Sequence, residues 1–131
     1  MRMQRTKILI ASGIFEVTLV PQDDSEAPAG RMTIKKKYSG KLVGTGIGQM
    51  ISKRTQGGVA AYAAIEEFEG DVAGKAGSFT LIHNGYMSSE AQSLKIEILE
   101  GSGQAELEKI SGALEITQQA GQHNYVLTYE L

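Results

Sequence analysis

The fold class follows from the stretch YSGKL at residues 38–42, whose pattern recurs as FEGDV at 68–72 and as ISGAL at 110–114. In each copy a large apolar residue precedes x-Gly-x, and a second apolar residue follows at strand spacing. A glycine in that place suits a bend or bulge in a curling strand, because glycine has no Cβ to clash. The three copies predict an antiparallel β-sheet that is curled or closed.

Most of the remaining chain also predicts strands. Apolar and polar residues alternate with period two, the pattern of a half-buried strand, most clearly at 13–19, 94–98 and 125–131. The segment 59–68 is ambiguous, because its four alanines and two glutamates suit a helix by propensity. Turn glycines bracket a strand-sized stretch there, so we predict a strand. For 104–109 we predict one helical turn.

About eight strands result, joined by short connections apart from one long loop at 21–30 that holds both prolines. An open sheet of so many strands would have to protect its exposed edges, whereas a closed sheet has none. We therefore expect one all-β domain over residues 1–131, a small antiparallel barrel of about eight strands that is closed or nearly closed.

Composition and charge exclude several classes of function. The chain has 131 residues and a net charge of −2, which provides no field for nucleic acid or an anionic membrane. The absence of cysteine excludes disulfides, zinc–thiolate sites and thiol catalysis. No stretch approaches the roughly 20 apolar residues of a membrane span. We expect a cytoplasmic protein with no cofactor, no metal, no nucleic-acid partner and no membrane partner.

Two local runs have a structural interpretation. The lysines at 35–37 alternate along a strand, so that Lys36 faces one side and its neighbours the other, which makes a poor phosphate groove. We interpret this run as a solvated strand face. Glycines 44, 46 and 48 share one face of another strand and leave a flat track, against which side chains or a ligand could lie. His123, beside a turn at Gly121, is expected to be solvated.

Several short motifs occur in an order and spacing that resemble a known family. They are GIFEV at 13–17, YSG at 38–40, EEFEG at 66–70, GSF at 77–79 with His83 and Gly85, GSG at 101–103, and Tyr125-x-Leu127-x-Tyr129. Over residues 13–131 the chain resembles a bacterial family of uncharacterised proteins with an allene-oxide-cyclase-like barrel. The resemblance implies a small antiparallel barrel of about eight strands and no established reaction.

The candidate site follows from which side chains share the barrel interior. If Phe68 points inward, alternation also turns Glu66 and Tyr62 inward, and His83 joins them from the neighbouring strand. A buried carboxylate needs a partner or loses its charge, and His83 is the expected partner of Glu66. Tyr38 and Tyr62 could line the same interior with their hydroxyls. We predict Glu66, His83, Tyr62 and Tyr38 as ligand-binding residues and assign no catalytic residue.

Three functions remain open at this point. The first is a binding protein that holds a small apolar molecule in the barrel interior. The second is an isomerase- or cyclase-like enzyme in which Glu66 and His83 act as acid and base. The third is a structural or homo-oligomer-forming barrel with a filled interior and no ligand. A register shift of one residue in the strand at 59–69 would turn Glu67 and Glu69 inward instead.

Overall fold

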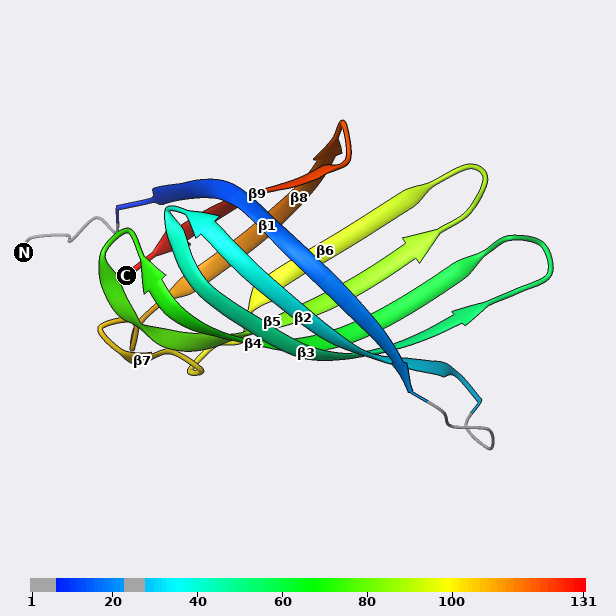
Figure 1. Ribbon diagram of the computed structural model, residues 1–131, viewed down its shortest axis with the longest axis horizontal. Helices are drawn as coiled ribbons and strands as arrows, with labels where there is room; N and C mark the ends of the chain where they lie inside the picture. The colour runs from blue at the N-terminus through cyan, green and yellow to red at the C-terminus, as the bar shows by residue number, and fades with distance from the viewer. Residues whose placement is uncertain (1–6, 23–27) are drawn as a thin grey trace, which may run out of the picture.

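The computed structural model describes residues 7–22 and 28–131, which form nine β-strands and no helix. These residues therefore contain no helix that could cross a membrane. The strands are β1 (Leu9–Gln22), β2 (Gly30–Gly40), β3 (Leu42–Arg54), β4 (Ala60–Val72), β5 (Lys75–Met87), β6 (Gln92–Ile98), β7 (Gln104–Ala105), β8 (Ser111–Gln119) and β9 (Gln122–Glu130). Eight strands form an antiparallel sheet in the order β4-β3-β2-β1-β9-β8-β6-β5, and β5 pairs back onto β4. The short β7 pairs with β5. This closed barrel, shown in Figure 1, confirms the predicted all-β fold.

The ambiguous segment 59–68, whose alanines favour a helix, forms part of strand β4 from Ala60 onward, as predicted. β4 pairs with β3 along one edge and with β5 along the other, over thirteen residue pairs each. Glu66 and Phe68 point inward and are buried, whereas Glu67 and Glu69 are exposed. Pairing on both edges therefore outweighs the preference of the alanines for a helix, and the strand has the expected orientation rather than the shifted one.

The central glycines of the repeats at 38–42 and 68–72 bend the chain in two different ways. Gly40 lies where β2 turns into β3, with a φ of +100°. Gly70 lies within β4, directly opposite Gly44 of β3, with a φ of +155°. A Cβ on residue 70 would overlap the carbonyl oxygen of Val43. Glycine at this position therefore lets the two strands approach closely and coil.

One half of the barrel is filled by side chains. Aromatic rings make up much of its core, and neighbouring ring centroids lie 4.9–5.6 Å apart among Phe15, Tyr38, Phe68, Phe79 and Tyr125. Buried Leu107 and Ile110, from the loop after β7, also pack into this core. The helical turn predicted for 104–109 is not present: the segment begins with β7 and continues as consecutive tight turns.

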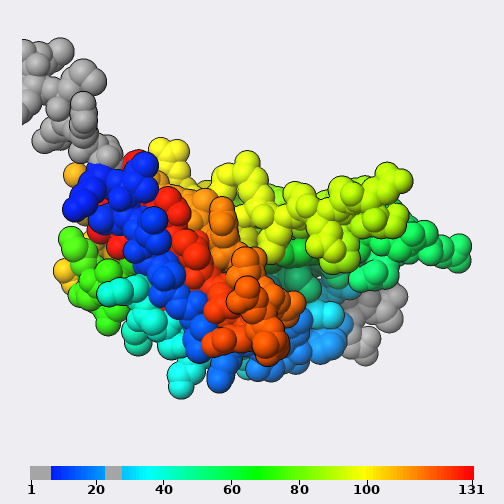
Figure 2. Space-filling view, turned by 90° about the horizontal axis from the view of Figure 1, so that it is seen from above, coloured from blue at the N-terminus to red at the C-terminus, as the bar shows by residue number. Residues whose placement is uncertain are grey.

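The other half of the barrel is open. The hairpins β3–β4, β5–β6 and β8–β9 project at this end, and β6 diverges from β8 (Figure 1). Seen from above, the surface is hollowed between the β5–β6 hairpin and the β8–β9 hairpin (Figure 2). Of the polar residues predicted from the sequence, Tyr38 belongs to the packed half and Tyr62 lines the open half.

Candidate functional site

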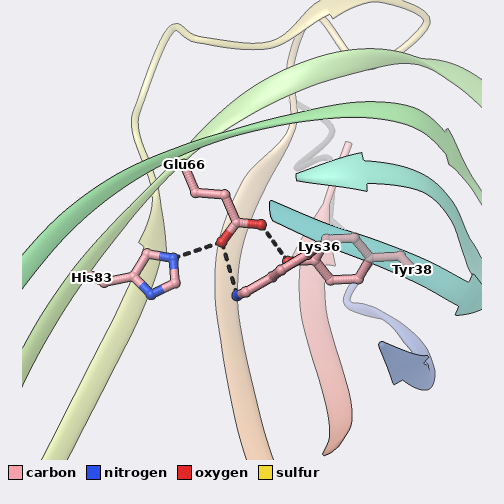
Figure 3. Close-up of polar contacts among 4 residues, drawn as sticks. All are labelled: Lys36, Tyr38, Glu66 and His83. Carbon is pink, nitrogen blue, oxygen red and sulfur yellow. Dashed lines mark hydrogen bonds and ion pairs between the residues drawn. The ribbon is translucent and has the colours of Figure 1, made fainter. Parts of the chain in front are cut away.

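Glu66 is the centre of a buried polar network in the barrel interior (Figure 3). Its side chain is fully buried. Oε1 lies 2.9 Å from both Nζ of Lys36 and Nε2 of His83, and Oε2 accepts a hydrogen bond of 2.5 Å from the Tyr38 hydroxyl. The expected contact between Glu66 and His83 is therefore present, within a larger network than the sequence predicted.

A glycine in β3 allows this network to form. Lys36 and Tyr38 belong to β2 and Glu66 to β4, so β3 lies between them. Gly46 of β3 pairs with Lys36 on one side and with Phe68 on the other. A Cβ on residue 46 would overlap Oε2 of Glu66. The glycine track predicted at 44–48 thus accommodates a side chain of the protein itself.

The surroundings of Glu66 keep its carboxyl ionised. Burial raises the pKa of this group, whereas the three donors around it lower the pKa, with His83 contributing most and Lys36 next. The net result is a pKa of about 2, below the ordinary value of 4.5. Burial, together with the nearby charge of Glu66, raises the pKa of Tyr38 well above 10.0. The Tyr38 hydroxyl therefore stays protonated and donates a hydrogen bond to Glu66.

The ionised carboxylate also sets the state of the His83 ring. Because a carboxylate can only accept hydrogen bonds, Nε2 of His83 carries the hydrogen that points at Glu66. In the neutral ring Nδ1 then holds a lone pair. Nδ1 has no hydrogen-bond partner among the described residues, and it faces away from Glu66 in Figure 3. Since no fully buried polar atom of those residues lacks a partner, Nδ1 keeps contact with open space.

Lys36 is the network member that sequence reasoning missed. The lysine run was expected to be a solvated face, and Lys35 and Lys37 are exposed as expected. For Lys36 the interpretation is wrong, because its residue exposure is only 7% and its Nζ also lies 4.7 Å from the centroid of the Phe15 ring. Alternation with Tyr38 on the same strand is the signal that points Lys36 inward.

A cavity of about 710 Å³ occupies the open half of the barrel. All eight barrel strands contribute to its wall, at positions nearer the projecting hairpins than the network residues. Every methionine of the described part of the chain lines it. The largest apolar side chains of the wall are Leu19, Met32, Met50, Met87, Leu94 and Ile116. Polar groups, among them Arg54 and Gln118, complete the wall.

Of the four predicted site residues, Tyr62 is the one that lines this cavity. Its ring packs against Gly85, the residue opposite it on β5. Burial raises the pKa of the Tyr62 hydroxyl. Glu66, His83 and Tyr38 do not line the cavity and instead bond to one another deeper in the barrel.

The two histidines occupy different places. His83 belongs to the buried network, whereas His123 is half-buried in the cavity wall and stacks on Phe15 with ring centroids 5.1 Å apart. The expectation of a solvated His123 is therefore wrong, and its alternation with buried Tyr125 along β9 is the signal that could have placed it. Within 7–22 and 28–131 no group of three His, Asp or Glu side chains is arranged to hold a metal ion.

Comparison with known proteins finds similar sequence and similar structure. The profile of a family described as "Protein of unknown function (DUF3224)" matches residues 11–129. A crystal structure at 1.84 Å resolution shows a protein of unknown function from the DUF3224 family of Shewanella oneidensis MR-1. It matches with 32% sequence identity and a TM-score of 0.87, over 94% of this chain and 96% of that one. No curated protein matches the sequence.

Proposed function

The chain belongs to the DUF3224 family, whose function is unknown, and we propose that it binds a small apolar molecule in the open half of its barrel. The observation that carries this proposal is the cavity of about 710 Å³ above the buried core. Ligand cavities of proteins typically measure about 300–1,000 Å³ and have mostly apolar walls with a few polar groups. The cavity of this barrel has both properties.

Methionine in the wall suits an apolar ligand of irregular shape. Met32, Met50 and Met87 come from three different strands and reach the cavity. Their side chains are unbranched and polarizable, so they adapt to the surface of a bound molecule. Without a ligand these side chains and Leu94, which is 45% exposed, contact water. A bound apolar molecule would remove that contact.

The four predicted site residues divide into two roles under this proposal. Tyr62 contacts the ligand directly, because it lines the cavity. Glu66 and Tyr38 position His83, since their own polar atoms bond within the network. None of these three residues lines the cavity, so under this proposal they support its base and leave the ligand contacts to the wall residues.

The geometry favours binding over the enzyme hypothesis. A general acid or base works best with a pKa near the operating pH. Glu66 has a pKa of about 2, and both of its oxygens accept hydrogen bonds from neighbouring side chains. The likeness to allene oxide cyclases accordingly stays a resemblance, and we propose no reaction from it.

A cavity-filling variant tests the proposed site. Ser52 lies opposite Tyr62 on β3 and lines the cavity, so Ser52→Phe should fill the space where the ligand binds. The probe is trans-parinaric acid, an unbranched fatty acid with four conjugated double bonds, whose fluorescence rises in apolar surroundings. We expect the parent protein to bind it and Ser52→Phe to weaken binding at least tenfold.

The matched control is Thr45→Phe, on the outer face of the same strand. This variant should bind the probe as the parent does. Equal affinity in Ser52→Phe and the parent, with both folded by circular dichroism, would place the probe elsewhere and contradict the proposal. So would a parent protein that does not bind the probe.

Location and assembly stay predictions. We propose a cytoplasmic location as the default for this chain, and a homo-oligomer on the basis of its outer surface. Ile47, Ile51 and Ile65 lie on the outer face of β3 and β4 and are 50%, 54% and 58% exposed. Light scattering on the purified protein measures the subunit count, and a strict monomer would contradict the homo-oligomer.

A further inference from the structure

The barrel wall is incomplete between β6 and β8. These strands pair at two positions only, Ile96 with Leu114 and Glu97 with Ala113. All other neighbouring strands of the eight-stranded barrel pair at seven or more positions. The contact between β6 and β8 is therefore the weakest in the closed sheet.

Beyond this contact each strand keeps a free edge. Residues 92–95 of β6 pair only with β5, and residues 115–119 of β8 pair only with β9. The two edges diverge toward the open end in Figure 1, and Figure 2 shows the surface hollowed between them. Unpaired backbone N–H and C=O groups thus face each other across a gap in the wall.

The gap leads into the cavity. Leu94 of β6 and Ile116 of β8 line the cavity from its two sides, and Gln92 and Gln118 line it nearer the strand ends. The gap therefore has an apolar inner part and a polar outer part. Backbone and side-chain amides can bind a hydroxyl, amide or carboxylate at the outer part.

We propose that this gap is the entrance of the cavity, and that it admits an unbranched alkyl chain whose polar end stays between the two free strand edges. The inference rests on the proposed function and adds the ligand class and its route. The gap is bordered by two extended strand edges that pair at two positions only, so an extended, flexible chain can lie along them. The sparse pairing of β6 with β8 also makes this the part of the wall that separates with the fewest broken hydrogen bonds.

The chain contains no cysteine, so the gap can be bridged specifically. If the register of Glu97 with Ala113 continues, Lys95 faces Glu115 on the outer surface, where both are exposed. We would make Lys95→Cys together with Glu115→Cys and join the two thiols with a short bis-maleimide, which does not require the strands to touch. The control carries the same bridge between Ala63→Cys and Asn84→Cys, two exposed partners on the fully paired strands β4 and β5.

The readout is the rate of uptake and release of trans-parinaric acid, an unbranched fatty acid, in stopped-flow fluorescence. We expect the bridge across the gap to slow both rates at least tenfold relative to the unbridged double variant, and the control bridge to leave them unchanged. Binding at unchanged rates in the bridged protein would overturn the entrance while leaving the proposed function in place. Failure of the parent protein to bind the probe would overturn both.

Discussion

Glu66 shows how a single buried charge connects three strands of the barrel. Its carboxylate accepts from Lys36 and Tyr38 on β2 and from His83 on β5, while its own backbone lies in β4. A buried ion pair stabilises a fold only if its remaining hydrogen-bonding groups are satisfied. Both carboxylate oxygens meet this condition here. Removing one partner should therefore lower the free energy of unfolding by much more than the small net contribution of the intact ion pair.

We expect Glu66→Gln to destabilise the barrel by about 3 to 5 kcal/mol, the typical cost of breaking a buried pair by removing one partner. The amide keeps the shape of the side chain but leaves Lys36 as a buried cation without its counter-charge. Urea unfolding followed by circular dichroism measures the change. The matched control is Glu69→Gln on the exposed face of the same strand, which should change stability by less than about 0.5 kcal/mol. Equal stability of the two variants would contradict a structural network.

The pKa of Glu66 predicts how this contribution depends on pH. Its carboxyl takes up a proton near pH 4.5 in the unfolded chain and near pH 2 in the folded barrel. Between these values unfolding binds a proton, so stability falls as the pH falls, by about 3 kcal/mol in total. The difference in unfolding free energy between the parent and Glu66→Gln should therefore be largest above about pH 5 and shrink toward pH 2. A difference that stays constant over this range would show that Glu66 has an ordinary pKa in the fold.

The orientation of Glu66 could be predicted from the sequence, but its surroundings could not. Alternation from Phe68 suffices to turn Glu66 inward, and the neighbouring strand supplies His83. Lys36 was missed because a run of lysines usually indicates a solvated face, and because its partner lies on a strand that is not its neighbour. Only the three-dimensional sheet shows that Gly46 lets the two side chains meet across β3.

Among the elements, two hairpins turn through two residues. Ala73 and Gly74 join β4 to β5, and Ala120 and Gly121 join β8 to β9, with positive φ at all four residues. Positive φ at both central residues is the property of a type I′ turn, which prefers Asn-Gly because asparagine tolerates this conformation better than alanine does. Both turns therefore hold an alanine in an unfavourable backbone conformation.

We expect Ala120→Asn to raise the stability of the barrel by about 0.5 to 1 kcal/mol, because asparagine relieves this strain without touching the core. Thermal unfolding should show a higher melting temperature for this variant. Ala91→Asn provides the comparison, since Ala91 is an exposed loop residue that is not among the non-glycine residues with positive φ. A gain of equal size in Ala91→Asn would mean that the turn geometry is not the cause.

The barrel as a whole divides into a packed half and an open half. The sequence predicted the number of strands and their closure, because turn glycines and period-two alternation are local signals. The division was not predictable, since the cavity depends on where Leu107 and the aromatic core pack and on how far the hairpins project beyond them. The gap between β6 and β8 likewise depends on a pairing between segments that are distant along the chain.

Native mass spectrometry can decide whether the open half of the barrel holds one apolar molecule. The purified protein would be incubated with dodecanoic acid, desalted and measured beside the Ser52→Phe variant. We predict one bound dodecanoic acid per chain in the parent, lost on denaturation, and none in the variant. A parent spectrum with only the bare polypeptide mass, or equal binding by both proteins, would contradict the proposed function.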